Sequence, residues 1–177
     1  MEAHDTAANA QKPAQSAESA ALQFFQLEPG GDSTAFRVLN EEWIQRLFTL
    51  EAVDREILNH PEDSILAKGG RILQVAHEGV TVGCVALIPK EPGVCEVGKM
   101  VVVPGLRGLG IGRRLLGYAL EQAEEMGVRK LTLNSSTKLP NAVHLYETVG
   151  FRHVPKEQWP PSEYNRTDVV MEMDLPR

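Results

Sequence analysis

A glycine-rich segment at residues 101–116 has the residue types and spacing of a binding site for an anion. A run of valines leads into Gly105, Gly108, Gly110 and Gly112, and an amphipathic helical pattern follows them. A glycine-rich turn at the start of a helix leaves backbone N–H groups without partners, and the helix dipole favours negative charge there. Arginines within and after the turn add positive charge. The segment therefore predicts a pyrophosphate site, with an ordinary strand-to-helix connection as the alternative.

Two common phosphate-binding loops do not fit this segment. A P-loop ends in Gly-Lys-Ser or Gly-Lys-Thr, whereas this chain continues from Gly112 with two arginines. A dinucleotide-binding turn requires a third glycine where Leu115 stands, and it requires an acidic residue at the end of the next strand. The next expected strand, at residues 130–136, contains no acid. Both readings are therefore excluded.

The loop from Arg107 to Gly112 resembles the Arg/Gln-x-x-Gly-x-Gly/Ala loop of the GNAT superfamily of acyl-CoA-dependent N-acyltransferases. Residues 142–151 read Ala-Val-His-Leu-Tyr-Glu-Thr-Val-Gly-Phe and resemble the second signature of that superfamily, Ala-x-x-Leu-Tyr-x-x-x-Gly-Phe. The two motifs occur in the usual order and at the usual separation, and the weaker resemblance around them covers residues 22–175. It implies an N-acetyltransferase that moves an acetyl group from acetyl-CoA to a primary amine by direct transfer in a ternary complex.

The resemblance also implies which residues hold acetyl-CoA. The backbone of Val101, Val102 and Val103 would pair with the pantetheine arm like an added strand and offer an amide to the acyl carbonyl. The pyrophosphate would lie on the loop made of Arg107, Gly108, Leu109, Gly110, Ile111, Gly112 and Arg113. Many relatives have an asparagine where this chain has Leu139. Asn134 and Ser136 are the candidates to replace its contact with the arm.

Tyr146 and Glu96 are the candidate acid and base. The resemblance implies that Tyr146 lies near the coenzyme sulfur and can protonate it, whereas a tyrosine packed on the sheet is the alternative. Glu96 stands in an otherwise apolar strand, where an unpaired carboxylate is costly. Many GNAT members have a glutamate in this region that draws the amine proton. An ion pair of Glu96 with Lys99 or Arg71, or a position facing solvent, explains it equally well.

The resemblance implies that the acceptor lies between residues 41–58 and residues 155–167. The first segment is acidic, which favours a cationic amine, although solvated helix faces explain its charges equally well. Its acidic residues are Glu41, Glu42, Glu51, Asp54 and Glu56. The second segment contains Trp159, Tyr164 and Arg166, which suit an apolar group and a carboxylate. We expect a small-molecule amine or a peptide N-terminus as acceptor, and a non-catalytic acyl-CoA sensor or partner-binding module is the alternative function.

The composition of the 177-residue chain bears on partners and compartment. A net charge of −6 and a pI near 5.4 leave no basic face for nucleic acid. No apolar run is long enough to span a bilayer, and no signal peptide is evident.

Cys84 and Cys95 are expected opposite Gly98 and Leu87, out of register for a disulfide, which indicates a reduced, cytoplasmic protein. The histidines show no metal-ligand spacing, so we expect no metal. Relatives are often dimers, so a homodimer is left open.

Hydrophobic periodicity and turn residues predict the elements that position these residues. We expect a disordered tail over residues 1–21 and a first helix with Asn40 as its N-cap. The resemblance implies that residues 22–177 form the N-acetyltransferase domain. Strict alternation along the strand at residues 94–103 puts Glu96, Gly98 and Met100 on one face and Val97, Lys99 and Val101 on the other. Further helices are expected at residues 53–58, 111–126 and 141–149, and strands at residues 22–27, 71–77, 81–89, 94–103, 130–133, 151–154 and 168–174.

This order of elements predicts the fold class. Strands paired in hairpins come first, and strands that alternate with helices follow them. Such an order predicts a single α/β (α+β) domain with a mixed, mostly antiparallel sheet flanked by helices. The same arrangement is implied by the resemblance to the GNAT superfamily.

Overall fold

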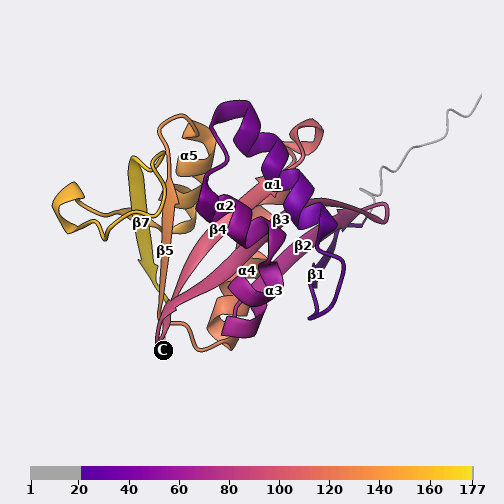
Figure 1. Ribbon diagram of the computed structural model, residues 1–177, viewed down its shortest axis with the longest axis horizontal. Coiled ribbons are helices and arrows are strands. Elements are labelled where there is room, and N and C mark those ends of the chain that lie inside the picture. The colour runs from indigo at the N-terminus through magenta and orange to yellow at the C-terminus, as the bar shows by residue number, and fades with distance from the viewer. Residues whose placement is uncertain (1–20, 177) are drawn as a thin grey trace, which may run out of the picture.

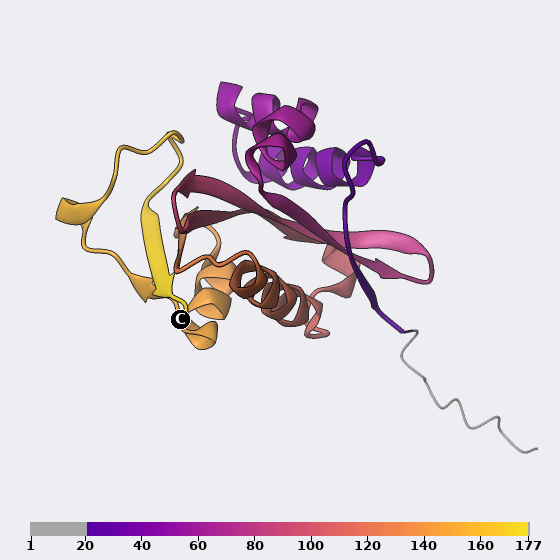
Figure 2. The same ribbon diagram turned by 90° about the horizontal axis from the view of Figure 1, so that it is seen from below.

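A seven-stranded sheet forms the middle layer of the structure, a computed structural model that describes residues 21–176. Helices cover both faces of this sheet, as Figure 2 shows from below. The strands are β1 (Gln23–Gln26), β2 (Arg71–His77), β3 (Val80–Glu91), β4 (Val94–Val102), β5 (Lys130–Ser135), β6 (Arg152–His153) and β7 (Val169–Asp174). One face carries α1 (Thr34–Leu47), α2 (Ala52–Asn59) and α3 (Pro61–Ser64), and the other carries α4 (Ile111–Glu125) and α5 (Pro140–Val149).

The strands lie in the order β1-β2-β3-β4-β5-β7-β6 (Figure 1). Every neighbouring pair is antiparallel except β4 and β5, which α4 connects by a crossover. The prediction of a single domain with a mixed, mostly antiparallel sheet flanked by helices is therefore confirmed. The tail predicted over residues 1–21 falls, apart from its last residue, outside the described residues, and the domain boundary at residue 22 stays a prediction.

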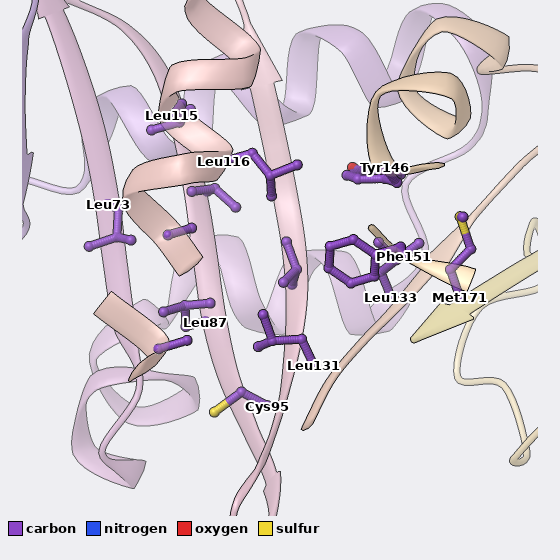
Figure 3. Close-up of a cluster of buried hydrophobic side chains, with 14 of the residues drawn as sticks. Leu73, Leu87, Cys95, Leu115, Leu116, Leu131, Leu133, Tyr146, Phe151 and Met171 are labelled. Carbon is purple, nitrogen blue, oxygen red and sulfur yellow. The ribbon is translucent and has the colours of Figure 1, made fainter. Parts of the chain in front are cut away.

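Two buried apolar clusters hold the helices on the sheet. Figure 3 shows Leu115 and Leu116 of α4 packed over the strands that carry Leu73 and Leu87. These leucines are fully buried, because α4 repeats apolar residues at helical spacing along the side that faces the sheet. The second cluster lies between the other face and α1–α3 and includes Phe36, Ile44, Leu58, Ile72 and Val101.

The first helix begins earlier than the sequence predicts. α1 starts at Thr34 with Ser33 as its N-cap, and Asn40 lies fully buried in its middle. Asn40 Nδ2 donates to the carbonyl of Phe36 at 2.9 Å, and its Oδ1 accepts from Trp43 Nε1 at 3.0 Å. The asparagine therefore resembles an N-cap in sequence, but its polar groups are satisfied by its own helix and by a neighbouring indole.

A bulge at Lys99 interrupts the expected alternation along β4. Gly98 pairs with Ala86 of β3 and Val101 pairs with Cys84, so β4 contains one more residue than β3 between these two pairs. Lys99 adopts a left-handed backbone with φ of 52°, which is unusual for a residue with a side chain. The expected register of Cys84 opposite Gly98 is therefore wrong.

The bulge redistributes the side chains that follow it between the two faces. The Lys99 side chain reaches Asp54 of α2, on the face that also carries Glu96, rather than the opposite face. Met100 turns to the other face and packs against the cluster that contains Tyr146. The turn of this hairpin lies at Pro92 and Gly93, so Cys95 pairs with Pro89 rather than with Leu87. Both cysteines are buried and free.

A buried ion cluster joins α2, β4 and the segment before β7. Lys99 Nζ lies 2.7 Å from Asp54 Oδ1, and Arg166 binds both oxygens of Asp54 at 2.6 and 2.7 Å. Arg166 also reaches Glu51, and the hydroxyl of Tyr164 accepts a hydrogen bond from Lys99 Nζ at 3.1 Å. Asp54 Oδ2 additionally accepts the backbone N–H of Glu51 in the capping box of α2. One carboxylate therefore fixes three segments that are distant in sequence.

Two opposing effects set the protonation of this cluster. Burial alone would raise the pKa of Asp54, but hydrogen bonds from Arg166 and the charge of Lys99 outweigh it and lower the pKa to about 2. Burial lowers the pKa of Lys99, and the charge of Asp54 opposes that shift. An unfolded aspartate has a pKa near 3.9. The stabilisation by Asp54 is therefore complete above about pH 4 and is lost as the pH falls toward 2.

We expect Asp54→Asn to lower the free energy of unfolding by about 3 kcal/mol at pH 7, because Lys99 would stay buried beside a neutral amide. Urea denaturation at pH 7 and at pH 3 measures the effect, and the difference from the unchanged protein should shrink at pH 3. Asp63→Asn is the matched control, since Asp63 is exposed on α3. Equal stability of the two variants at pH 7 would contradict this account.

Candidate active site

A pocket of about 620 Å³ lies where β4 and β5 separate. The two strands pair only from Val94 to Glu96 on β4 and from Lys130 to Thr132 on β5, and then diverge (Figure 1). Beyond Glu96, the edge of β4 that faces β5 has no strand partner within residues 21–176. The pocket runs along this edge and is lined by β4, the glycine-rich loop, the starts of α4 and α5, the end of α1 and residues 164–167. An extended ligand can therefore pair with the free edge.

The glycine-rich loop presents backbone N–H groups at one part of this pocket. Gly110 is the N-cap of α4 with φ of 76°, and no side chain caps the helix. The first intrahelical bond runs from Arg114 N to Gly110 O, so the three preceding N–H groups lack an intrahelical partner. A Cβ at Gly108 or Gly110 would meet no atom within 4 Å. The loop therefore combines open space, free donors and a helix N-terminus, which suits a pyrophosphate.

Seven of the ten residues expected to hold acetyl-CoA line the pocket. They are Val101, Val102, Arg107, Gly108, Gly110, Gly112 and Arg113. The other three, Val103, Leu109 and Ile111, are not part of the lining: Leu109 points to solvent and Ile111 is buried in the core. Arg107 Nε donates to the carbonyl of Val102 at 3.2 Å, which ties the loop to the end of β4.

Tyr146 lies on α5 with its hydroxyl at the bulge of β4. Its ring is buried in an edge-on contact with Phe151, and its hydroxyl lies 3.9 Å from Sδ of Met100 (Figure 3 shows the ring). The residue also lines the pocket. Burial raises the pKa of Tyr146 to about 12, so the phenol stays protonated at neutral pH. A protonated hydroxyl therefore lies beside Met100 in the lining of the pocket.

Glu96 is buried and lines the same pocket. Its carboxylate forms an ion pair with Lys90 at 3.1 Å, rather than with Lys99 or Arg71 as the alternative interpretation expected. Arg71 instead bonds to Gln122 and Glu125 of α4. Among the described residues, Glu96 is the one acidic residue in the pocket lining.

The residues proposed to replace the missing family asparagine also reach the pocket. Asn134, Ser136 and Leu139 all line it, at the end of β5 and just before α5. Ser136 is buried, and its hydroxyl accepts the backbone N–H of Lys138 at 3.2 Å. Polar side chains therefore remain at this wall although leucine occupies the family position.

The pocket lining differs from the acceptor wall that the sequence indicates. Tyr164 and Arg166 line the pocket, but Trp159 does not, because its indole donates to the carbonyl of Val154 outside it. Of the five acids at residues 41–58, none lines the pocket. Asp54 is fully buried in its ion cluster, so it offers no charge to a cationic amine.

Several lining residues were missed by sequence reasoning. Trp43, Arg46, Leu47 and Phe48 reach the pocket from the end of α1, and Lys138 reaches it from the loop before α5. The sequence indicated the four residues at the end of α1 only weakly, since the acceptor was expected near residues 41–58. It gave no indication of Lys138, because the position of Lys138 against Phe48 depends on tertiary packing.

Within residues 21–176, no group of three or more His, Cys, Asp or Glu residues has the geometry to hold a metal ion. In the same range, no helix is long and apolar enough to cross a membrane.

Comparison with known proteins identifies the family. The model of the acetyltransferase (GNAT) family matches residues 35–151. An uncharacterized N-acetyltransferase of Escherichia coli is 39% identical over 83 residues, which cover 45% of this chain and 50% of that protein. An uncharacterized N-acetyltransferase of Schizosaccharomyces pombe is 30% identical over 125 residues, covering 68% of this chain and 77% of that protein. The match thus spans about half the length of the bacterial relative.

A solved structure shares the fold. The crystal structure of a GNAT-family acetyltransferase from Staphylococcus aureus has a TM-score of 0.79 to this chain, at 19% identity, and covers 88% of this chain and 100% of its own. At that identity the similarity shows the fold alone. The family model, however, matches more than half of the sequence and includes both motifs. The chain therefore belongs to the acetyltransferase (GNAT) family.

Proposed function

We propose that the chain is an N-acetyltransferase that moves an acetyl group from acetyl-CoA directly to the amine of a small molecule or a peptide N-terminus. The observation that carries the proposal is one continuous pocket that contains a helix N-terminus with free backbone N–H groups, a buried tyrosine with a raised pKa and a carboxylate. A module that only bound acyl-CoA would need the first of these and neither of the others. The names of the relatives as N-acetyltransferases agree with the proposal.

The loop and β4 divide the binding of the donor between them. The N–H groups at the start of α4 would hold the pyrophosphate, with Arg107 and Arg113 nearby as cations. The free edge of β4 would pair with the pantetheine arm and leave an amide near Val101 for the acyl oxygen, where negative charge develops. The fit rests on the open space at Gly108 and Gly110.

Glu96 and Tyr146 would handle the protons of the reaction. The amine is mostly protonated at pH 7, and Glu96 would accept its proton, directly or through water, before the nitrogen attacks the acyl carbon. As the carbon–sulfur bond breaks, Tyr146 would donate its O–H to the departing sulfur. An ordinary thiol has a pKa near 8.5, which is below that of Tyr146. A strong hydrogen bond from the Tyr146 hydroxyl therefore suffices to stabilise the departing thiolate, and complete proton transfer to the sulfur is not needed.

Direct transfer agrees with the state of the two cysteines. Burial raises the pKa of Cys84 to about 12 and raises the pKa of Cys95 as well. Neither thiol is therefore ionised at neutral pH, which disfavours an acylated cysteine as an intermediate.

We expect Tyr146→Phe to lower kcat about 100-fold, because it removes a proton donor from the transition state. Thiol release from acetyl-CoA is measured with a panel of amino acids, polyamines and short peptides, and the affinity for coenzyme A should stay unchanged. Tyr118→Phe is the matched control, since Tyr118 lies on α4 and does not line the pocket. Turnover equal to that of the control would remove Tyr146 from the mechanism.

We expect Gly110→Val to abolish binding of coenzyme A, because the new side chain would occupy the space of the pyrophosphate. Calorimetric titration with coenzyme A gives the affinity. Gly127→Val is the matched control: Gly127 follows the other end of α4 with φ of 75°, against 76° for Gly110, and a Cβ there also meets no atom. The backbone strain is therefore similar in both variants. Equal affinity in both would disprove the assignment of the pyrophosphate site.

A further inference from the structure

The lining of the pocket carries positive charge outside the glycine-rich loop. Six cations line it within the described residues, whereas Glu96 is the one carboxylate in the lining. The cations are Arg46, Lys99, Arg107, Arg113, Lys138 and Arg166. The whole chain, in contrast, has a net charge of −6. The positive charge is therefore concentrated at this site, and its distribution bears on the acceptor.

The six cations fall into three groups by their contacts. Arg107 bonds to Val102 and Arg113 to Thr148, so both stay beside the glycine-rich loop. Lys99 and Arg166 are balanced by the carboxylates of Asp54 and Glu51.

Arg46 and Lys138 form the third group. Within residues 21–176 neither is part of an ion pair. These two therefore supply the uncompensated charge of the wall.

Both uncompensated cations stand at the acceptor wall. Lys138 Nζ lies 5.3 Å from the ring centre of Phe48, and the guanidinium of Arg166 lies 5.8 Å from the same ring. Arg46 is two residues before Phe48, in the last turn of α1. The loop before α5, the end of α1 and the segment before β7 thus meet around one aromatic ring. Leu47 and Leu139 add apolar surface to the lining of the same pocket.

We infer that the acceptor is an amine that also carries a carboxylate, namely a free amino acid with an apolar side chain. The inference rests on the proposed function and names its substrate class. The amine would face Glu96, the carboxylate would pair with Arg46 and Lys138, and the apolar side chain would lie against Phe48 and its leucine neighbours. A polyamine would instead bring a second positive charge to two unpaired cations.

The transfer step balances with this acceptor. The amine nitrogen bonds to the acetyl carbon, and the carbon–sulfur bond breaks. One proton of the ammonium passes to Glu96 before the attack, and the second leaves the nitrogen for water as the tetrahedral intermediate collapses. The sulfur leaves as a thiolate that is hydrogen-bonded to the hydroxyl of Tyr146. The carboxylate of the acceptor takes no part in the bond changes, so its contribution is to binding and orientation.

The first test compares each L-amino acid with its own carboxamide, with spermidine as a third arm, by thiol release from acetyl-CoA. The amide keeps the amine and the side chain but lacks the negative charge. It also loses its ammonium proton more easily, since a neighbouring carboxylate raises the pKa of an amine. We nevertheless expect kcat/KM for an apolar amino acid to exceed that for its amide by about tenfold or more.

The second test removes the cations. We expect Arg46→Gln and Lys138→Gln each to raise KM for the amino acid about tenfold, with kcat and the KM for acetyl-CoA unchanged. KM for the amide should not change. Arg55→Gln and Lys68→Gln are matched controls, because both residues are exposed and lie outside the pocket lining.

Three results would overturn the inference. Amides or spermidine could be used as well as amino acids, no amino acid could be used at all, or the two variants could raise KM for acetyl-CoA instead. The last result would assign Arg46 and Lys138 to the donor. None of these decides whether the chain is an acetyltransferase. That question depends on coenzyme A affinity and on transfer to any amine. Failure of the amino-acid inference can therefore be distinguished from failure of the proposed acetyltransferase function.

Discussion

The bulge at Lys99 is the constraint on which the site depends. One extra residue in β4 keeps Lys99 on the face of Glu96 and turns Met100 toward Tyr146. Without it, strict alternation would place Met100 beside Glu96 and remove Lys99 from α2. The cost is a left-handed backbone at a lysine and a buried ammonium. Contacts of Asp54 with Lys99 and Arg166 offset that cost.

The ion cluster also explains how the wall proposed to bind the acceptor is held. The segment before β7 has little regular structure, yet Arg166 and Tyr164 are fixed by Asp54 and Lys99. Because the charges of the cluster cancel, it shapes the wall without setting its potential. The electrostatic potential of the wall is instead set by cations outside the cluster and by Glu96, so that opposite charges lie in one pocket of about 620 Å³. Such a pocket matches a ligand with both charges.

The sequence predicted the fold, and most of the residues that it indicated for the donor line the pocket, because both signals are local. The glycines and arginines of residues 105–113 and the signature at residues 142–151 each lie within a single turn and helix. Periodicity placed β2 at its observed residues, Arg71–His77. The helix N-terminus that is proposed to bind the pyrophosphate required no knowledge of distant contacts, since it is formed by neighbours in sequence.

The proposed acceptor site could not be predicted in the same way, because its residues meet through tertiary contacts. Asp54 bonds to Lys99 and Arg166, which lie 45 and 112 positions away in the sequence. Because these partners are distant, the sequence indicated an accessible carboxylate at this position rather than one buried in ion pairs. A bulge depends on how two strands pair, and nothing in the sequence around Lys99 marks it. Trp159 was expected to contact a ligand, but its indole N–H donates a hydrogen bond to the carbonyl of Val154.

The central claim is that the pocket carries out acyl transfer and does not only bind a coenzyme, and Glu96 tests it most directly. The measurement is amine-dependent thiol release by Glu96→Gln and by Lys90→Gln, which each break the same 3.1 Å ion pair. The account predicts that Glu96→Gln loses about 100-fold in kcat, because the base is gone, while its affinity for coenzyme A persists. Lys90→Gln keeps the carboxylate and should keep turnover. Equal turnover in both variants would contradict the account and leave Glu96 as a partner in an ion pair.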